Sequence, residues 1–314
     1  MSRFPLTSHR ATDRPVRNKI LLAGVFLLAI LIQPLHAEGR SVIKTGEVVV
    51  VSEDSLRGAA GVVADGYGAL KLDLETIFGW KLDFVPTVVL IRDRDEFQRI
   101  TGTNVVVAIA VPDKDLIVID HSRMHMHPFS LGTTLKHELC HLLLHHAIKG
   151  ENLPAWLDEG VSQWASGGPA EIVKGGRESI LKAAALANSQ IALSSLSKGF
   201  PPDLESLSLA YEESKSLVEY LVSEFGRTSM LNLLQHLKDG DGVETAALKS
   251  LGVSMADVEG RWHDHLRTGK FWLPYVTSSF SLILFFVAAL LTIGGFVRLV
   301  IKKRRYRDDD FLER

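Results

Sequence analysis

Apolar and polar positions alternate with two different periods in the first half of the chain. Short apolar runs, some joined by turns, predict strands at residues 41–51, 87–91, 105–111 and 116–119. Apolar residues at three- and four-residue steps predict an amphipathic helix from about Leu56 to Ile77, stopped by Gly79. Residues 93–100 predict a short helix with acidic residues in its first turn.

Helical periodicity dominates the second half. Beyond an apolar run around residues 133–144, helices are predicted at 154–164, 177–187, 211–225, 228–238, 241–251 and 254–266. A helix and mostly antiparallel strands that lead into a helical region predict an α+β fold. We expect a small mixed or antiparallel sheet plus helices, followed by a mostly helical lobe.

The first residues have the order of a secretory signal. Basic residues precede an uncharged run of about 13 residues, Ile20 to Ile32, and small Ala37 follows at a suitable cleavage position. We therefore predict a signal peptide at residues 1–37. An uncleaved signal anchor is the alternative.

The other end predicts a membrane span. Val276 to Val297 carries no charge, and about 22 helical residues reach roughly 33 Å, enough to cross a bilayer. A basic cluster follows, as is typical of the cytoplasmic side. We expect one transmembrane helix within 271–300 and a cytoplasmic tail at 301–314. The protein would then be a single-pass cell-membrane protein whose main part is extracytoplasmic, on the periplasmic side in a Gram-negative bacterium.

Between these ends we expect an N-terminal α/β lobe at 38–127 and a helical lobe at 128–270. Hydrophobic residues make up 46% and charged residues 23% of 314, an ordinary globular mixture. A net charge of −2 gives no reason to expect a nucleic-acid partner. Cys140 is the single cysteine, so any metal must be held by histidines and carboxylates.

The apolar run around residue 140 contains the strongest chemical signal. His137 and His141 would lie one helical turn apart on the same face, so both imidazoles can reach one metal ion. Glu138 is rotated about 100° from His137 and can hold a water beside that ion. This pattern is typical of zinc sites that keep one position open for water.

A third protein ligand is needed. The extended motif with a third histidine is excluded, because Leu144 and Ala147 stand at its positions. His145 lies on the same face as His141, but three successive turns of a straight helix cannot converge on one ion. Glu159 is the better candidate, because the intervening residues allow one helix to end and a second to cross back.

Here the chain resembles the gluzincin metallopeptidases, the group of thermolysin and aminopeptidase N, and especially the bacterial peptidase MA-like domains. Residues 156–160 match the segment Trp-Leu-x-Glu-Gly of the aminopeptidase N branch. The resemblance implies a zincin-like fold and one Zn²⁺ per chain, held by His137, His141 and Glu159. It also implies that Glu138 is the catalytic base and that Tyr211 stabilises the oxyanion; Tyr220 is the less favoured alternative.

One departure from the aminopeptidase pattern affects the expected substrate. Those enzymes carry an upstream Gly-x-Met-Glu-Asn, whose Glu anchors the free amine of the substrate, but residues 105–111 contain no Glu. We therefore expect a membrane-anchored endopeptidase that acts on extracytoplasmic peptides or proteins. The alternative is a catalytically inactive zincin-like domain that serves as a membrane-tethered binding or assembly module. For Asp158, contact with a ligand histidine and simple solvation both remain open.

Overall fold

The computed structural model describes residues 39–150, 152–168, 180–267 and 292. The predicted signal peptide, the predicted cytoplasmic tail and all of segment 271–300 except Thr292 lie outside these residues. Within the described part of the chain, no helix combines the length and the apolar character needed to cross a membrane. The chain divides into two compact units, residues 1–259 and 260–314; the sheet and the candidate metal centre both lie in the first. The predicted boundary between lobes at residue 127 stays a prediction.

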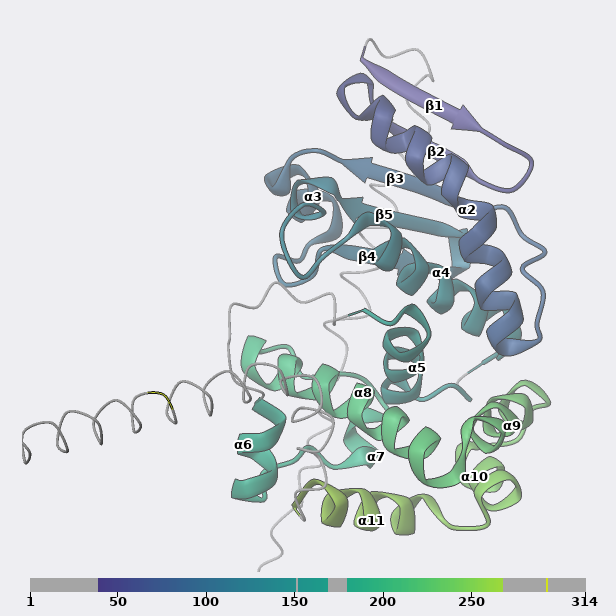
Figure 1. The fold of residues 1–314 in the computed structure, drawn as a ribbon, viewed down its shortest axis with the longest axis vertical. Helices are drawn as coiled ribbons and strands as arrows, with labels where there is room; N and C mark the ends of the chain where they lie inside the picture. Colours follow the sequence, from purple (N-terminus) through teal and green to yellow (C-terminus); the bar gives the residue numbers. More distant parts are fainter. Residues whose placement is uncertain (1–38, 151, 169–179, 268–291, 293–314) are drawn as a thin grey trace, which may run out of the picture. The chain divides into compact units, whose positions relative to one another are not determined.

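A five-stranded sheet forms the N-terminal half of the first unit (Figure 1). Its strands are β1 (Arg40–Lys44), β2 (Val49–Glu53), β3 (Thr87–Ile91), β4 (Ala108–Val111) and β5 (Leu116–Asp120), in the order β1-β2-β3-β5-β4. The two predicted hairpins, β1–β2 and β4–β5, are antiparallel. The central pairs β2–β3 and β3–β5 are parallel.

A mixed sheet is therefore confirmed, but the expectation of mostly antiparallel strands is wrong for its centre. The parallel pairing follows from the segments that connect these strands. The chain between β2 and β3 forms α2 (Arg57–Phe78), and the chain between β3 and β5 forms α3 (Arg94–Thr101) and the edge strand β4. Connections of this length return the chain to the same end of the sheet, which parallel pairing requires.

Helices cover both faces of the sheet. Leu116 and Val118 of β5 pack with Phe97 and Ile100 of α3, so the alternate residues Ile117 and Ile119 point to the other face. On that face lie α2 and α4 (Leu131–Ala147), with α4 beside β4 and β5 (Figure 1). All residues of β5 are consequently buried.

Helices also make up the rest of the described chain. They are α5 (Ala155–Ser166), α6 (Ile180–Ala187), α7 (Leu193–Leu196), α8 (Leu204–Phe225), α9 (Arg227–Lys238), α10 (Val243–Leu251) and α11 (Met255–Arg267), with short 3₁₀ turns at Asp54–Leu56, Pro112–Lys114 and His121–Arg123. The predicted helices are confirmed where the structure describes them, but α7 was not predicted. Helix α8 starts at Leu204, seven residues before the predicted start, because the side chain of Asp203 caps it by accepting a hydrogen bond from the Ser206 N–H at 2.9 Å.

Gly160 lets α5 cross α8 at very close range. A Cβ atom at this position would lie 2.3 Å from the carbonyl oxygen of Ser214 and 2.7 Å from Cγ2 of Val218. Any side chain would therefore push the two helices apart. The Gly of the Trp-Leu-x-Glu-Gly segment thus has a packing role, and α8 determines where α5 lies.

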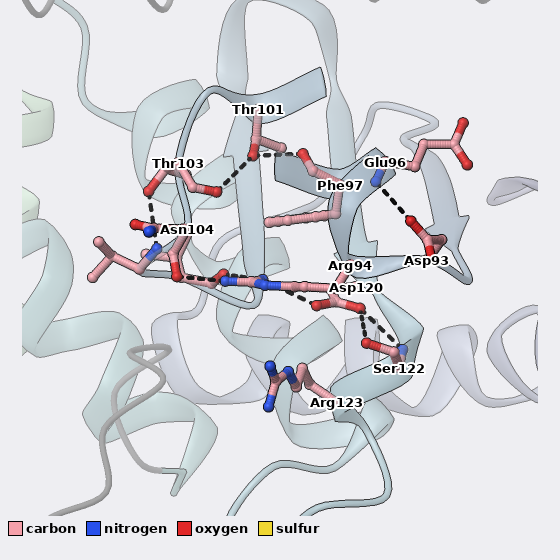
Figure 2. A network of polar contacts seen from close by, with 12 residues as sticks. Asp93, Arg94, Glu96, Phe97, Thr101, Thr103, Asn104, Asp120, Ser122 and Arg123 are labelled. Carbon is pink, nitrogen blue, oxygen red and sulfur yellow. Dashed lines mark hydrogen bonds and ion pairs between the residues drawn. The ribbon is translucent and has the colours of Figure 1, made fainter. Parts of the chain in front are cut away.

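Figure 2 shows a polar network that ties α3 to the segment before β4. Arg94 donates from Nη1 to the carbonyl oxygen of Val106 at 2.8 Å and from Nη2 to that of Asn104 at 2.6 Å. Its Nη1 also lies 3.0 Å from Oδ2 of Asp120, whose side chain is fully buried at the end of β5. The other carboxylate oxygen of Asp120 accepts hydrogen bonds from the N–H and hydroxyl of Ser122. One guanidinium thus fixes the entry to the edge strand β4.

We predict that Arg94→Met lowers the free energy of unfolding by about 3–5 kcal/mol, because it leaves the buried Asp120 carboxylate without its partner. Urea unfolding of the purified protein measures this loss. Arg99→Met is the matched control on the same helix: the Arg99 side chain is 73% exposed, so its loss should change stability by less than about 0.5 kcal/mol. Equal effects of the two variants would contradict the structural importance of the network.

Candidate metal centre

Helix α4 places His137 and His141 on one face, one turn apart. The helix starts at Ser130, whose hydroxyl accepts a hydrogen bond from the N–H of Thr133 at 3.3 Å. The two imidazole rings meet edge to face, with centroids 4.7 Å apart, and their Nε2 atoms lie 3.0 Å apart. Both Nε2 atoms therefore point to the same place.

Glu159 of α5 completes a group of three possible ligands. Its Oε1 lies 3.5 Å from Nε2 of His137, and its Oε2 lies 3.7 Å from Nε2 of His141. The ligand atoms of these three side chains are all within 4.8 Å of one another. Helices α4 and α5 pack against each other, which brings Glu159 to the two histidines. The structure thus brings together the three residues that the sequence predicts as ligands.

Glu138 is buried next to this group. Its carboxyl group is 1% exposed, and its Oε1 has no hydrogen-bond partner among the described residues. Burial raises the pKa of Glu138 to about 8. The nearby His141 lowers this pKa in part, and the carboxylate of Glu159 adds to the rise. A buried carboxylate oxygen with no protein partner fits a place for a water molecule or a substrate group.

The pKa values of all four side chains are shifted from their usual values. Burial raises the pKa of Glu159 to about 7. Burial and the charge of His141 hold the pKa of His137 well below its usual value. For His141, burial works against the charged form, but the carboxylate of Asp158 outweighs it and raises the pKa to about 10. Two imidazoles and a carboxylate that converge in this way match the donor set of a catalytic Zn²⁺ site.

Asp158 orients His141. Its Oδ1 lies 2.7 Å from Nδ1 of His141, so the Nε2 atom of that ring is left to face Glu159. Burial opposes ionisation of Asp158, but its contact with His141 holds its pKa well below the usual range. The hydroxyl of Ser162 lies 3.3 Å from the same Nδ1. Of the two interpretations left open by the sequence, the structure supports contact with His141, a possible ligand.

The next two histidines of α4 lie outside the group of ligands. His145 Nε2 is 2.9 Å from Oδ2 of Asp158, on the far side of that carboxylate from His141. His146 contacts Asp115 and stacks on Phe84, with ring centroids 3.9 Å apart. For His145, these contacts agree with the expectation that a third successive turn of α4 does not reach the ion.

Tyr211 lies in the second turn of α8, close enough to be affected by the carboxyl groups of the site. Burial first, then the charges of Glu159 and Glu138, raise its pKa well above the usual value, so the phenol keeps its proton. Its ring packs edge to face on Phe200 at 5.2 Å. The less favoured Tyr220 instead packs against Phe225, near the end of the same helix.

Sequence reasoning missed two contributors, Ser162 and Gln163. The amide of Gln163 donates to the carbonyl oxygen of Tyr211 at 3.1 Å, and a hydrogen bond from the same side chain lowers the pKa of Glu159. Gln163 therefore connects the predicted ligand helix to the predicted oxyanion helix. Ser162 and Gln163 lie three and four residues after Glu159, on the same face of α5. This spacing could have identified both residues from the sequence.

The edge strand β4 borders the same helix. Within the described sheet β4 pairs only with β5, and α4 lies against it. One side of β4 therefore has no neighbouring strand in the part of the chain that is described. This is the segment in which the sequence lacks an amine-anchoring Glu.

Comparison with known families gives one match. The model of the family described as "Peptidase MA superfamily" matches residues 101–268, a range that includes His137, His141, Glu159 and Tyr211. A search of curated proteins finds no match.

Solved structures give matches at low sequence identity. An M1 zinc metallopeptidase from Deinococcus radiodurans is 15% identical with a TM-score of 0.42, over 73% of this chain and 50% of the other. A mutant of that enzyme with a bound Tyr-Ser-Ala substrate is 16% identical with a TM-score of 0.42, over 73% and 51%. Yeast LTA4 hydrolase is 12% identical with a TM-score of 0.42, over 74% and 38%. The chain therefore spans about half the length of the Deinococcus enzyme and 38% of the yeast enzyme.

We predict that the metal-free protein loses thermal stability as the pH rises from about 6.5 to about 9. Glu138, Glu159 and His141 have pKa values of about 8, about 7 and about 10 in the folded protein, all above their unfolded values. The folded state therefore holds more protons than the unfolded state in this range, and its stability falls as they are released. Thermal unfolding with and without Zn²⁺ tests this.

Zinc should reverse the trend, because a metal binds the deprotonated forms and its affinity rises with pH. The control is His137→Ala, in which added Zn²⁺ should no longer counter the fall. A metal-free protein whose unfolding temperature rises with pH across this range would contradict the electrostatic account.

Proposed function

Because the chain belongs to the Peptidase MA superfamily, we propose that it is a zinc-dependent metallopeptidase that hydrolyses peptide bonds. The observation that carries the proposal is the convergence of His137, His141 and Glu159, with Glu138 buried beside them. His137 and His141 would bind zinc through Nε2, and Glu159 through its carboxylate. The same three ligand types occur in catalytic zinc sites that leave a position for water.

Zinc bound there would polarise the peptide carbonyl and lower the pKa of a water molecule to near 7. Glu138 then acts as general base: its Oε1, which has no partner in the described residues, accepts the proton of the attacking water. The same carboxyl group delivers that proton to the departing amine.

Tyr211 donates a hydrogen bond to the oxyanion of the tetrahedral intermediate. Its raised pKa keeps the phenol protonated, and the contribution of the Glu159 and Glu138 charges to that rise supports this role. Gln163 donates a hydrogen bond to the carbonyl oxygen of Tyr211 and so fixes the position of the tyrosine relative to Glu159.

The substrate binds as an extended strand along the free side of β4, by main-chain hydrogen bonds. Because residues 105–111 offer no carboxylate to hold a terminal amine, the enzyme is an endopeptidase. Main-chain pairing of this kind accepts many sequences, so side chains around the metal centre would supply the specificity.

A catalytically inactive binding module is the other candidate. Such a module has no use for Glu138, whose buried Oε1 lacks a hydrogen-bond partner among the described residues and therefore costs stability. This feature favours the enzyme.

We further propose that the peptidase is anchored by a single span within 271–300 and works outside the cytoplasm, with residues 1–37 as its export signal. The support is the sequence alone: the uncharged run beside a basic cluster, and the signal-like start. This site would act on extracytoplasmic peptides or proteins.

We predict that Glu138→Gln binds about one zinc per chain like the wild type but hydrolyses peptides about 10²–10⁴ times more slowly, because only the proton transfer is lost. Glu159→Ala should lose both zinc and activity. Tyr211→Phe should keep zinc and lose about 10²–10³ in kcat, and Tyr220→Phe is its control with activity near wild type. Metal analysis and peptide cleavage assays measure these effects. Full activity in Glu138→Gln would refute the mechanism.

We predict that peptides with an acetylated N-terminus are cleaved internally as fast as the same peptides with a free amine, because no residue of 105–111 can bind that amine. Mass spectrometry of the products identifies the cut bonds. Strict dependence on a free amine, with release of single terminal residues, would replace the endopeptidase proposal by an aminopeptidase.

We predict that the full chain stays with membranes after an alkaline carbonate wash, while a chain shortened to end at Arg267 appears in the soluble fraction. The difference is expected because only the full chain contains the apolar run at 276–297. Release of both proteins by the wash would contradict the anchor.

A further inference from the structure

One carboxylate joins a possible metal ligand to an exposed histidine. Oδ1 of Asp158 lies 2.7 Å from Nδ1 of His141, and Oδ2 lies 2.9 Å from Nε2 of His145. The His141 side chain is 13% exposed, that of Asp158 18% and that of His145 41%. A continuous chain of polar contacts therefore runs from the surface to the metal centre.

We propose that His145 is a positioning residue for the metal centre, which holds Asp158 so that His141 is aimed at the ion. This proposal rests on the zinc site of the proposed function. The His145 ring occupies Oδ2 of the carboxylate, and this second contact stops the carboxylate from rotating about its Cβ–Cγ bond. Oδ1 is thereby kept on Nδ1 of His141, which fixes the ring plane and the direction of Nε2.

Ser162 explains why the second contact matters. Its hydroxyl lies 3.3 Å from Nδ1 of His141, so a competing partner stands next to Asp158. If the carboxylate turned away, a neutral hydroxyl would replace a charged acceptor and lower the basicity of the imidazole. Groups that contact metal-binding histidines in this way typically change metal affinity 10–100-fold when they are mutated.

His145 is a poor candidate for a direct ligand or for an element of the core. Its Nε2 is already engaged by Asp158, and it lies a full turn beyond His141 on α4. Its exposure makes its contact with Asp158 worth little as a surface pair, about 0–1 kcal/mol. An effect on metal binding without an effect on folding would therefore be specific to positioning.

His146 provides a matched control. It is the next residue on the same helix and also pairs with an aspartate, Asp115. That aspartate contacts none of the three possible ligands in any hydrogen bond or ion pair recorded for the described residues. Removal of His146 therefore tests the loss of a histidine–aspartate pair at this end of α4 without touching the metal centre.

The experiment compares full-chain wild type, His145→Leu, His145→Gln and His146→Leu at one fixed pH. Zinc affinity is measured by competition with a chromophoric chelator, and the visible spectrum is recorded after Co²⁺ substitution. His145→Leu should bind zinc about 10-fold more weakly and shift the Co²⁺ bands. His145→Gln should restore most of the affinity, because its amide N–H can reach the same oxygen of Asp158. His146→Leu should behave like the wild type.

Wild-type affinity and an unchanged Co²⁺ spectrum in His145→Leu would overturn the proposal. So would a His145→Gln variant no better than His145→Leu, or an equal loss in His146→Leu. None of these readouts requires peptide hydrolysis. A wild-type protein that cleaves no peptide would contradict the proposed function, yet the expected pattern of zinc affinities in that protein would still support the positioning role.

Discussion

The burial of Glu138 and Glu159 beside two imidazoles is the constraint on which the rest of the site depends. A carboxylate removed from water costs several kcal/mol unless opposite charge or hydrogen bonds compensate it. Among the described residues, neither Oε1 of Glu138 nor Oε1 of Glu159 has a hydrogen-bond partner. Both pKa values rise as a result. Such an arrangement is understandable if a divalent cation supplies the missing charge.

The geometry of this site is set by how closely the helices approach one another. Gly160, in the middle of α5, allows this helix to cross α8, and just beyond the C-terminal end of α5 a Cβ on Gly168 would lie 2.2 Å from Cγ2 of Thr133, in the first turn of α4. Helix α5 therefore packs closely on α8 at its middle and on α4 just beyond its C-terminal end. Glu159 directly precedes Gly160, so the close crossing of α5 and α8 limits how far its carboxylate can move from the two histidines.

Local patterns in the sequence were sufficient for much of the fold and for the core of the site. The spacing of His137 and His141 placed both on one face of a helix, and Gly79 marked the end of α2 through its left-handed φ of 70°. The parallel centre of the sheet could not be derived, because strand order depends on contacts between residues far apart in sequence. The same holds for the shared carboxylate: whether Asp158 meets His141, His145 or solvent depends on how α5 crosses α4. Helix α8 was placed too late because the cap at Asp203 was overlooked.

The central claim is that two histidines of α4 and one glutamate of α5 hold a zinc ion. Diffraction from crystals of the zinc-loaded protein, recorded on both sides of the zinc absorption edge, tests it most directly. We expect one anomalous peak about 2.0–2.2 Å from Nε2 of His137, Nε2 of His141 and a carboxylate oxygen of Glu159. A peak bound by other residues, or one that Glu159 does not contact, would contradict it.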